Sequence, residues 1–428
     1  MLASRNCSGG HADADTERGL SQNRDLSAHS LEADGAKVNV KGLGGLGRGV
    51  LSSIVDISFI GLLAPLPHGK AYGMSKSLAT ARQATLVVIK TEAGMEGVGE
   101  AWGVPQVNVA YLPLLKSYLI GADVTDVELV FARILARHYH FGLQNQMMAC
   151  LSGIDIAAKD AVGKETGLPV CRLIGGRGND RVPVYASGGY LTEQPQRDFP
   201  PQIEAMAEAG YAAVKIKIGL GPKSDLERVA FARNRLGGEV DILVDINSNY
   251  TVDLARASIA RLTEYRIGWV EEPLAPQDFD GYARLRLTSP VPIATGEALY
   301  TVFDFKRLLD VGGVDVIQPD LSLCGGFWQG RRIADLAETH HVRLSPHVWG
   351  TGIGLAAAVH FVASRAPHPH AQNVPWPTLV EYDVGENPLR EEILVRPLRA
   401  ANGFIEVPAE PGLGVKIDWD NVSRYSIG

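Results

Sequence analysis

The sequence has few cysteines, and they form no recognisable pattern. Only four occur in 428 residues: Cys7, Cys150, Cys171 and Cys324. A disulfide framework or a zinc site would require cysteines in pairs or clusters at short spacings. Neither is indicated, so a reducing compartment is expected.

Long apolar runs are also missing. No segment reaches the roughly 20 uninterrupted apolar residues that a membrane span needs. The first residues, MLASRNCSGGHADADTERG, contain no apolar stretch of the kind found in secretory signals. We therefore expect no membrane partner and, by elimination, a cytoplasmic location.

An excess of basic charge is absent as well. The formal net charge is −7, and the 41 Lys and Arg residues are spread along the chain. A nucleic-acid partner would require basic residues gathered in a patch or stripe, so none is expected. Hydrophobic content of 46%, with 47 Gly and 24 Pro, indicates a turn-rich globular protein.

Residues 1–52 are polar and rich in Gly, Ser and Asp, which predicts a mobile tail. Within this tail, Gly42–Gly47 has the GxGxxG spacing of dinucleotide sites. No long helical pattern follows it, and no second mononucleotide-binding unit occurs downstream. A flexible glycine linker is therefore the favoured interpretation.

Three further regions follow the tail. Residues 54–175 combine strand-like runs with helical patterns up to Gly167, which predicts an α+β domain. Residues 180–384 hold eight short strand-like runs separated by amphipathic segments, the pattern of a (β/α)8 barrel. Residues 385–428 return to short strands and turns. The predicted fold is α/β, a (β/α)8 TIM-like barrel with an α+β capping domain built from the N-terminal part and the C-terminal segment.

The strand-like runs of the barrel, from the second to the eighth, end on ionisable residues. In chain order these are Lys217, Asp245, Glu271, Glu297, Asp320, His347 and Glu381. A barrel enzyme carries its active site at the C-terminal ends of its strands. One such residue alone could equally be a helix cap. Seven ionisable residues in equivalent positions at the strand ends predict an active site.

Three of these residues predict a metal site. Asp245, Glu271 and Glu297 follow successive strands, and converging carboxylates repel one another unless a cation neutralises them. Hard oxygen ligands suit one Mg²⁺ ion. Asn247, on the same strand face as Asp245, is placed to orient a ligand or a metal-bound water. Glu272 is expected to point away, because side chains alternate along a strand.

The remaining residues predict acid/base groups. Lys215 and Lys217 share one face of their strand, and an ammonium beside a second lysine and a cation is driven toward its neutral form. Lys217 is therefore the candidate base, with Lys215 as its tuner. On adjacent strands, Asp320 would orient His347 as a second acid/base group. Glu381 is expected to act as a hydrogen-bond donor or acceptor toward a developing oxyanion.

A base, a dyad and a metal between them favour a carboxylate substrate, because a cation on a carboxylate stabilises the enediolate formed when the α-proton leaves. We expect α-proton abstraction from a hydroxylated acid, followed by β-elimination. Racemisation or epimerisation of a 2-hydroxy acid by two bases stays open. A metal-independent Schiff-base lyase using Lys217 as nucleophile, or a binding protein without catalysis, are alternatives of other classes.

The ordered motifs KIKIG, VDIN, WVEEP, TGE, QPDLSLCGG and SPHVWGTG resemble the mandelate racemase subgroup of the enolase superfamily, from about residue 54 onward. The resemblance implies a capping domain over the barrel, one Mg²⁺ on the three carboxylates, bases on two faces and a homo-oligomer. PHVWGTG and NPLREEILVRPLRAANGFIEVPAEPGLG are most similar to D-galactarolactone cycloisomerases and related enzymes. They imply a sugar acid or its lactone as substrate, and cycloisomerisation or dehydration as the reaction.

A segment of the capping domain is expected to cover the site and select the substrate. It is APLPHGKAYGMSKS, with His68, Tyr72 and Lys76 as candidate lid residues. Trp102, after GVGEA, is a further candidate. A surface loop is the alternative interpretation of the segment, and simple packing is the alternative for Trp102.

Overall fold

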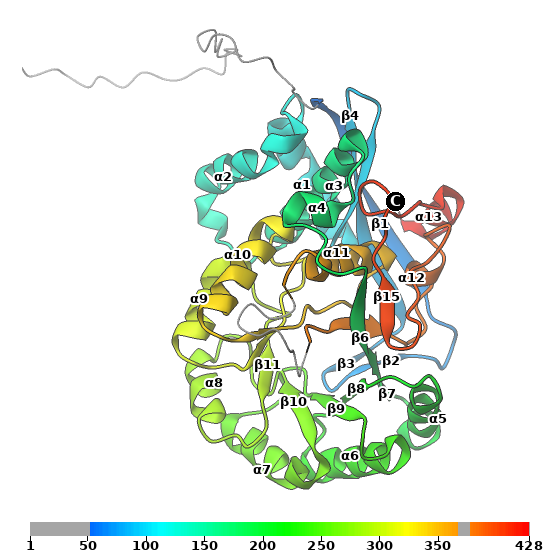
Figure 1. The fold of residues 1–428 in the computed structure, drawn as a ribbon, viewed down its shortest axis with the longest axis vertical. Helices are drawn as coiled ribbons and strands as arrows, with labels where there is room; N and C mark the ends of the chain where they lie inside the picture. The colour runs from blue at the N-terminus through cyan, green and yellow to red at the C-terminus, as the bar shows by residue number, and fades with distance from the viewer. Residues whose placement is uncertain (1–51, 367–376, 428) are drawn as a thin grey trace, which may run out of the picture. The chain divides into compact units, whose positions relative to one another are not determined.

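A computed structural model of the chain describes residues 52–366 and 377–427 (Figure 1). The described residues belong to one compact unit that begins at Val50. The predicted tail, apart from Ser52, and its stretch Gly42–Gly47 lie outside the described residues.

An antiparallel sheet begins the described part, with its strands in the order β16–β1–β4–β5. Their bounds are β1 (Ile54–Pro65), β4 (Ala81–Thr91), β5 (Glu96–Ala101) and β16 (Ser426–Ile427). β1 and β4 pair almost throughout, from Ile54–Thr91 to Pro65–Ala81. β16 comes from the other end of the chain and pairs with β1, so the C-terminal segment completes this sheet.

Helices follow these strands, and the first and third of them pack against the sheet (Figure 1). They are α1 (Pro105–Leu119), α2 (Val127–Arg137), α3 (Gln146–Thr166) and α4 (Val170–Ile174). α3 begins where Asn145 Oδ1 accepts the Met147 N–H at 2.8 Å and ends at left-handed Gly167. A β-carbon at Gly99 of β5 would lie 2.1 Å from the carbonyl oxygen of Gly153. Only glycine permits this close contact between strand and helix.

The second sheet holds eight parallel strands in the order β13–β12–β11–β10–β9–β8–β6–β14. Their bounds are β6 (Arg181–Gly188), β8 (Ala213–Lys217), β9 (Asp241–Asp245), β10 (Ile267–Glu271), β11 (Ile293–Thr295), β12 (Val316–Ile317), β13 (Arg343–Leu344) and β14 (Val380–Asp383). Just past β13, Ser345 Oγ donates to the Leu379 carbonyl before β14 at 2.8 Å. The two outermost strands of the order are thereby held together, and the curled parallel sheet confirms the predicted fold class.

Helices alternate with these strands on the outside of the sheet (Figure 1). They are α5 (Pro195–Glu208), α6 (Pro222–Leu236), α7 (Val252–Leu262), α8 (Phe279–Arg286), α9 (Thr301–Asp310), α10 (Gly326–Thr339) and α11 (Gly352–Ala363). Outward side chains such as Val214 and Ile216 join the core shared with the helices. Inward side chains form a smaller cluster that includes Tyr185, Leu243 and Trp269. Lys215 and Lys217 therefore point into the barrel, as strand alternation requires.

A hairpin from the N-terminal part joins the loop that follows β6. β2 (Tyr72–Met74) pairs both with β3 (Ser77–Ala79) and with β7 (Leu191–Thr192). The remaining elements are β15 (Phe404–Glu406), α12 (Pro388–Glu391), α13 (Trp419–Tyr425) and the 3-10 helices η1 (Val124–Asp126), η2 (Tyr139–Phe141) and η3 (Thr263–Tyr265). Within the described ranges, no helix combines the length and apolar character needed to cross a membrane.

Candidate active site

The C-terminal ends of the parallel strands bring the seven predicted ionisable residues together. Lys217, Asp245 and Glu271 are the last residues of β8, β9 and β10. The strand register pairs Lys217 with Asp245, and Asp245 with Glu271. The others lie just beyond β11, β12 and β13 or within β14, and are Glu297, Asp320, His347 and Glu381.

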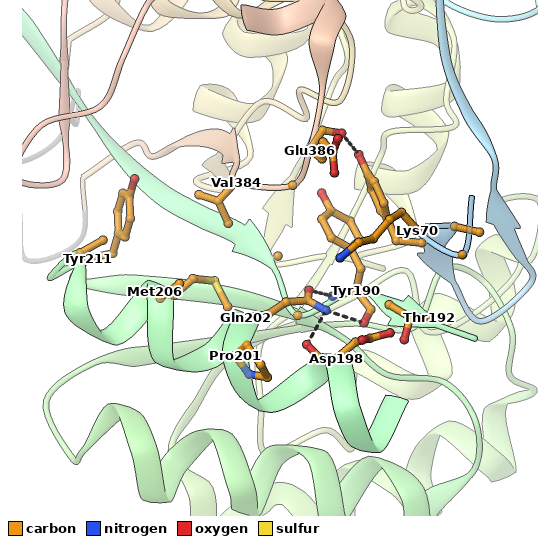
Figure 2. A pocket seen from close by; sticks show the side chains of 18 residues that line it. Lys70, Tyr190, Thr192, Asp198, Pro201, Gln202, Met206, Tyr211, Val384 and Glu386 are labelled. Atoms are coloured by element: carbon orange, nitrogen blue, oxygen red, sulfur yellow. Dashed lines mark hydrogen bonds between the residues drawn. The ribbon is translucent and has the colours of Figure 1, made fainter. Parts of the chain in front are cut away.

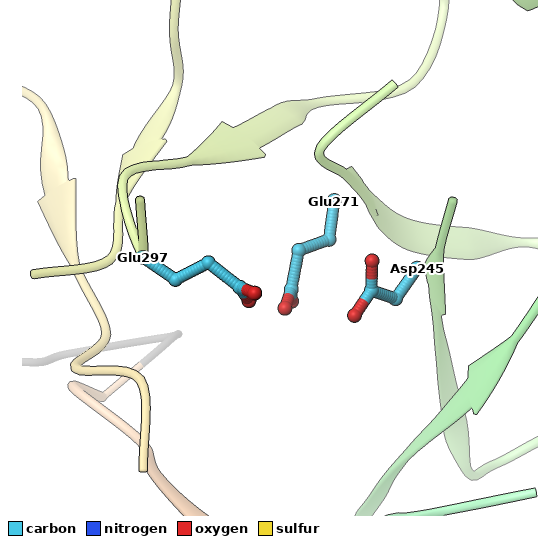
Figure 3. Close-up of side chains that lie close together, drawn as sticks. All are labelled: Asp245, Glu271 and Glu297. Atoms are coloured by element: carbon cyan, nitrogen blue, oxygen red, sulfur yellow. The ribbon is translucent and has the colours of Figure 1, made fainter. Parts of the chain in front are cut away.

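Three carboxylates form a row with Glu271 in the middle (Figure 3). One oxygen from each of Asp245, Glu271 and Glu297 lies within 4.8 Å of the other two. Glu297 Oε2 is buried and accepts no hydrogen bond from the described residues. Hard oxygen donors gathered this closely fit a divalent cation such as Mg²⁺. Asn247 lies beside them, and its N–H donates to Asp245 Oδ1 at 2.8 Å.

The two lysines of β8 meet different carboxylates. Lys215 Nζ contacts Glu271 and lies 2.8 Å from Glu381 Oε1, whereas Lys217 Nζ lies 2.5 Å from Asp245 Oδ2. Burial would lower both pKa values, but these carboxylates outweigh it and raise the pKa of each lysine above its ordinary value. The lowered pKa that the sequence predicts for Lys217 refers to the site with a cation bound, where Asp245 would be a ligand of that cation.

His347 and Asp320 form the predicted dyad, with His347 Nδ1 2.8 Å from Asp320 Oδ2. The other ring nitrogen, Nε2, lies 3.3 Å from Glu297 Oε2. Burial would lower the pKa of His347, but the nearby carboxylates, Glu297 and Glu381 foremost, raise it to about 10. These carboxylates favour the imidazolium form of the ring. It stands at the Glu297 end of the carboxylate row, and Lys217 stands at the Asp245 end.

Glu271 is held in place by two donors that the sequence did not identify. Gln318 Nε2 and Trp269 Nε1 donate to its Oε2 at 2.7 and 3.1 Å. Burial raises the pKa of Glu271 to about 7, although Lys215 opposes the shift. Gln318 lies in the motif QPD, two residues before Asp320. Its position directly after β12 and just before Asp320 of the dyad is the sequence feature that could have identified it.

Both carboxylate oxygens of Glu381 have close partners. Lys215 contacts Oε1, and the Val348 N–H donates to Oε2 at 3.1 Å. Burial would raise the pKa of Glu381, but Lys215 and His347 lower it. The group is therefore an ionised hydrogen-bond acceptor, and the donor role that the sequence also allowed is not favoured.

A cavity of about 330 Å³ lies over these groups, and Lys217, Asn247, Glu297 and His347 line it. Among the predicted lid residues, Lys76 and Trp102 also line this cavity. Two others lie elsewhere. His68 is exposed and does not line it, and Tyr72 is buried, with its hydroxyl donating to the Glu386 carbonyl at 2.5 Å.

The wall of this cavity includes two aromatic residues that the sequence did not identify. Tyr190 follows β6, Trp349 follows β13, and Trp349 Nε1 donates to the Tyr190 hydroxyl at 3.1 Å. Tyr190 also lines a neighbouring cavity of about 530 Å³, together with Lys70, Tyr72 and Gln202 (Figure 2). Tyr190 thus separates two hollows of the molecule.

The predicted outward direction of Glu272 is wrong, because its side chain lines the same cavity as Lys217 and His347. Alternation holds only while the backbone stays extended. Strand β10 ends at Glu271, and Glu272 has φ of +39°, in the left-handed region. This single change of backbone direction turns the side chain of Glu272 inward.

The chain matches two family models. Residues 67–175 match the N-terminal domain of mandelate racemase/muconate lactonizing enzyme, and residues 199–421 match the enolase C-terminal domain-like model. Together the two matches cover most of the described residues, including the hairpin β2–β3 and the seven strand-end residues.

Individual relatives are similar over most of their lengths. D-galactarolactone cycloisomerase of Agrobacterium fabrum is 37% identical over 346 residues, which are 80% of this chain and 91% of that protein. Arabinonate dehydratase of Saccharolobus solfataricus is 32% identical over 334 residues, 77% of this chain and 87% of that protein. The crystal structure of a racemase from Streptomyces coelicolor with bound magnesium has a TM-score of 0.78 at 28% identity, and covers 87% of this chain and 100% of that one.

Proposed function

The chain belongs to the mandelate racemase/muconate lactonizing enzyme family of the enolase superfamily, and we propose that it removes the proton α to the carboxylate of a sugar acid or its lactone and then expels the β substituent. One observation carries this proposal. Lys217 and His347 line one cavity and stand at opposite ends of a row of three carboxylates. A substrate bound over that row would have a proton-transfer group on either side.

Asp245, Glu271 and Glu297 are the residues that would hold one Mg²⁺ ion. Such an ion, when bound, stabilises the negative charge that develops on the substrate carboxylate as the α-proton leaves. The protein supports this site with Gln318 and Trp269, which orient Glu271.

The side chains divide the proton transfers between them. Lys217 Nζ accepts the α-proton as a neutral amine, and the Cα–H electrons form the double bond to the carboxylate carbon. His347 Nε2 then gives its proton to the leaving β-oxygen as the Cβ–O bond breaks, while Asp320 orients the ring through Nδ1. Loss of a ring oxygen of a lactone gives a cycloisomerase, and loss of a hydroxyl group gives a dehydratase.

Racemisation or epimerisation is the second candidate, and the same placement favours it. If His347 returned the proton to Cα instead of the β-oxygen, configuration would invert without elimination. A Schiff-base lyase is less well supported, because it gives no role to the three carboxylates that converge beside Lys217. Borohydride trapping in EDTA would detect such a covalent adduct.

A screen of aldonic acids, aldaric acids and their lactones in D₂O, followed by NMR and mass spectrometry, tests the proposal. Cycloisomerisation yields a product isomeric with its substrate, and dehydration yields one that has lost water. EDTA is expected to abolish turnover and Mg²⁺ to restore it. The Lys217→Met and His347→Asn variants are expected to lose about 10²–10⁴-fold in rate. Exchange with inversion and no elimination would favour the epimerase, and unchanged turnover in Lys217→Met would refute the mechanism.

A further inference from the structure

Glu272 is a buried carboxyl in the wall of the active-site cavity, and one of its oxygens has no partner among the described residues. The residue is 4% exposed, and its Oε1 atom accepts no hydrogen bond there. It lines the same cavity as Lys217 and His347. A buried polar group without a hydrogen bond destabilises the folded protein. A ligand that paired with this carboxyl would remove that destabilisation.

The backbone aims the carboxyl of Glu272 into the cavity at a further cost. Its φ of +39° is unfavourable for a residue with a β-carbon. The neighbouring strands hold this conformation, because the Glu272 N–H donates to the Ala294 carbonyl at 2.9 Å and its carbonyl accepts the Ser248 N–H at 2.6 Å. Strain of this kind is found at functional sites, where the surrounding structure imposes it.

The surroundings of Glu272 define the chemistry of its ligand. Glu297 lines the same cavity as Glu272, so an anionic group of a ligand would approach two carboxyl groups here. Glu272 is not one of the three residues whose oxygens converge within 4.8 Å. A hydroxyl group both donates and accepts hydrogen bonds, so it can pair with this carboxyl in either protonation state.

We propose that Glu272 binds a hydroxyl group of the substrate and makes the site selective for polyhydroxylated acids over acids that lack that hydroxyl. The inference rests on the proposed function in one respect, that the ligand is a carboxylate with a chain of hydroxyl groups. It adds a residue that contacts the substrate away from the metal and the two proton-transfer groups.

Two substitutions separate this role from others. Glu272→Gln keeps the shape and a group that pairs with hydroxyls, and Glu272→Met keeps the length without a polar group. Both are placed in the Lys217→Met background, which blocks turnover. Calorimetry with Mg²⁺ then measures the binding of the best acid from the substrate screen and of its series of mono-deoxy analogues.

We expect Glu272→Met to weaken binding of the hydroxylated acid about tenfold or more and to leave the affinity for one deoxy analogue unchanged. Glu272→Gln is expected to retain most of the affinity. Equal losses for the parent acid and every analogue would contradict the inference. So would loss of Mg²⁺ binding in the absence of acid, which would make Glu272 a metal ligand.

Thermal unfolding without metal or acid gives an independent test. Glu272→Met is expected to be at least as stable as the parent, because it removes an unpaired buried carboxyl. The matched control is Glu100→Met, since Glu100 is equally buried but accepts hydrogen bonds from Thr351 and Gly354. That variant should be destabilised. A destabilised or unfolded Glu272→Met protein would show that Glu272 has a structural partner and would overturn the inference.

The two proposals fail in different ways. If the Lys217→Met parent binds no sugar acid in the presence of Mg²⁺, the proposed function fails at the substrate class. If the parent binds the acid and Glu272→Met discriminates hydroxylated from deoxy acids as the parent does, only the role of Glu272 fails.

Discussion

Two lysines that are equivalent in the strand pattern have separate roles in the structure. Lys215 is fully buried between Glu271 and Glu381, and it does not line the cavity. Lys217 lines the cavity and has one close carboxylate, Asp245. Only Lys217 can meet a substrate, so Lys215 acts by neutralising the carboxylates beneath the site.

Another buried ionisable residue, His360 in α11, predicts a dependence of stability on pH. Its Nδ1 accepts the Cys171 N–H at 3.3 Å, so the proton resides on Nε2, which faces the Leu413 carbonyl at 3.1 Å. If Nδ1 also carried a proton, that proton would point at the Cys171 N–H, which is itself a donor. Burial accordingly lowers the pKa of His360 from 6.5 to about 4.

Because the unfolded chain binds this proton more readily, the stability associated with a neutral His360 is present above pH 6.5 and is lost as the pH falls toward 4. We expect the free energy of unfolding to decrease by up to about 3 kcal/mol over this range. His360→Gln keeps one donor and one acceptor but does not titrate. Urea unfolding of both proteins from pH 7 to 4 should show a steeper loss in the parent, and parallel curves would contradict the prediction.

At the scale of elements, helix α6 supports the strand that carries the candidate base. Arg228 of α6 is buried, its Nε donates to the carbonyl of Lys217 at 2.9 Å, and its Nη2 donates to the carbonyl of Gly189 at 2.6 Å. Its guanidinium stacks over the Phe199 ring at 3.8 Å. The buried guanidinium of Arg228 thus donates hydrogen bonds to main-chain carbonyl oxygens at the end of β8.

Arg228→Lys is expected to slow α-proton exchange by about tenfold or more while leaving KM nearly unchanged, because a lysine cannot hold both carbonyls and Lys217 would lose its exact position. The matched control lies on the same helix. Arg233 donates to the carbonyls of Tyr265 and Val240 and is not near the active-site end of β8. Arg233→Lys should lower thermal stability without slowing exchange measured well below the melting temperature. Equal slowing in both variants would rule out positioning by Arg228.

The strands of the barrel show where prediction from the sequence was sufficient. Each of the eight predicted runs contains one parallel strand, because the alternation of apolar residues and the breaks between runs are local features. The lid was harder to predict. Lys76 lines the cavity and His68 does not, although both belong to one polar segment whose path depends on the pairing of β2 with β7.

At the scale of the whole molecule, a buried ionic cluster joins parts of the chain that are distant in sequence. Arg82 of β4 lies 3.2 Å from Asp383 at the end of β14, and Arg390 of α12 approaches the same oxygen at 3.2 Å. Arg82 also stacks over the Trp349 ring at 3.6 Å, and the Tyr190 hydroxyl donates to Asp383 at 2.7 Å. The cluster therefore connects the first sheet and the C-terminal segment to the wall of the active-site cavity.

Asp383 is expected to be the most sensitive member of this cluster. Asp383→Asn leaves the buried Arg82 guanidinium without a carboxylate, whereas Arg390 keeps Glu391 at 2.8 Å, and we expect a loss of about 3–5 kcal/mol in the free energy of unfolding. Arg82→Met should cost less, because Arg390 still neutralises Asp383. Denaturant unfolding at one pH compares the two variants. A larger loss in Arg82→Met would show that Arg390 does not compensate for Arg82.

The sequence by itself determined the fold class and the candidate residues at the strand ends, because strand alternation and strand-end position are properties of short segments. The family followed from the resemblance of its ordered motifs. Only the tertiary structure decided how those residues are used. The inward turn of Glu272 depends on one backbone dihedral angle, and the hydroxyl of the buried Tyr72 donates to the carbonyl of Glu386, which is far away in the chain. The pKa of Lys217 likewise depends on its contact with Asp245 across two strands. Such contacts join residues from separate segments, and no local pattern encodes them.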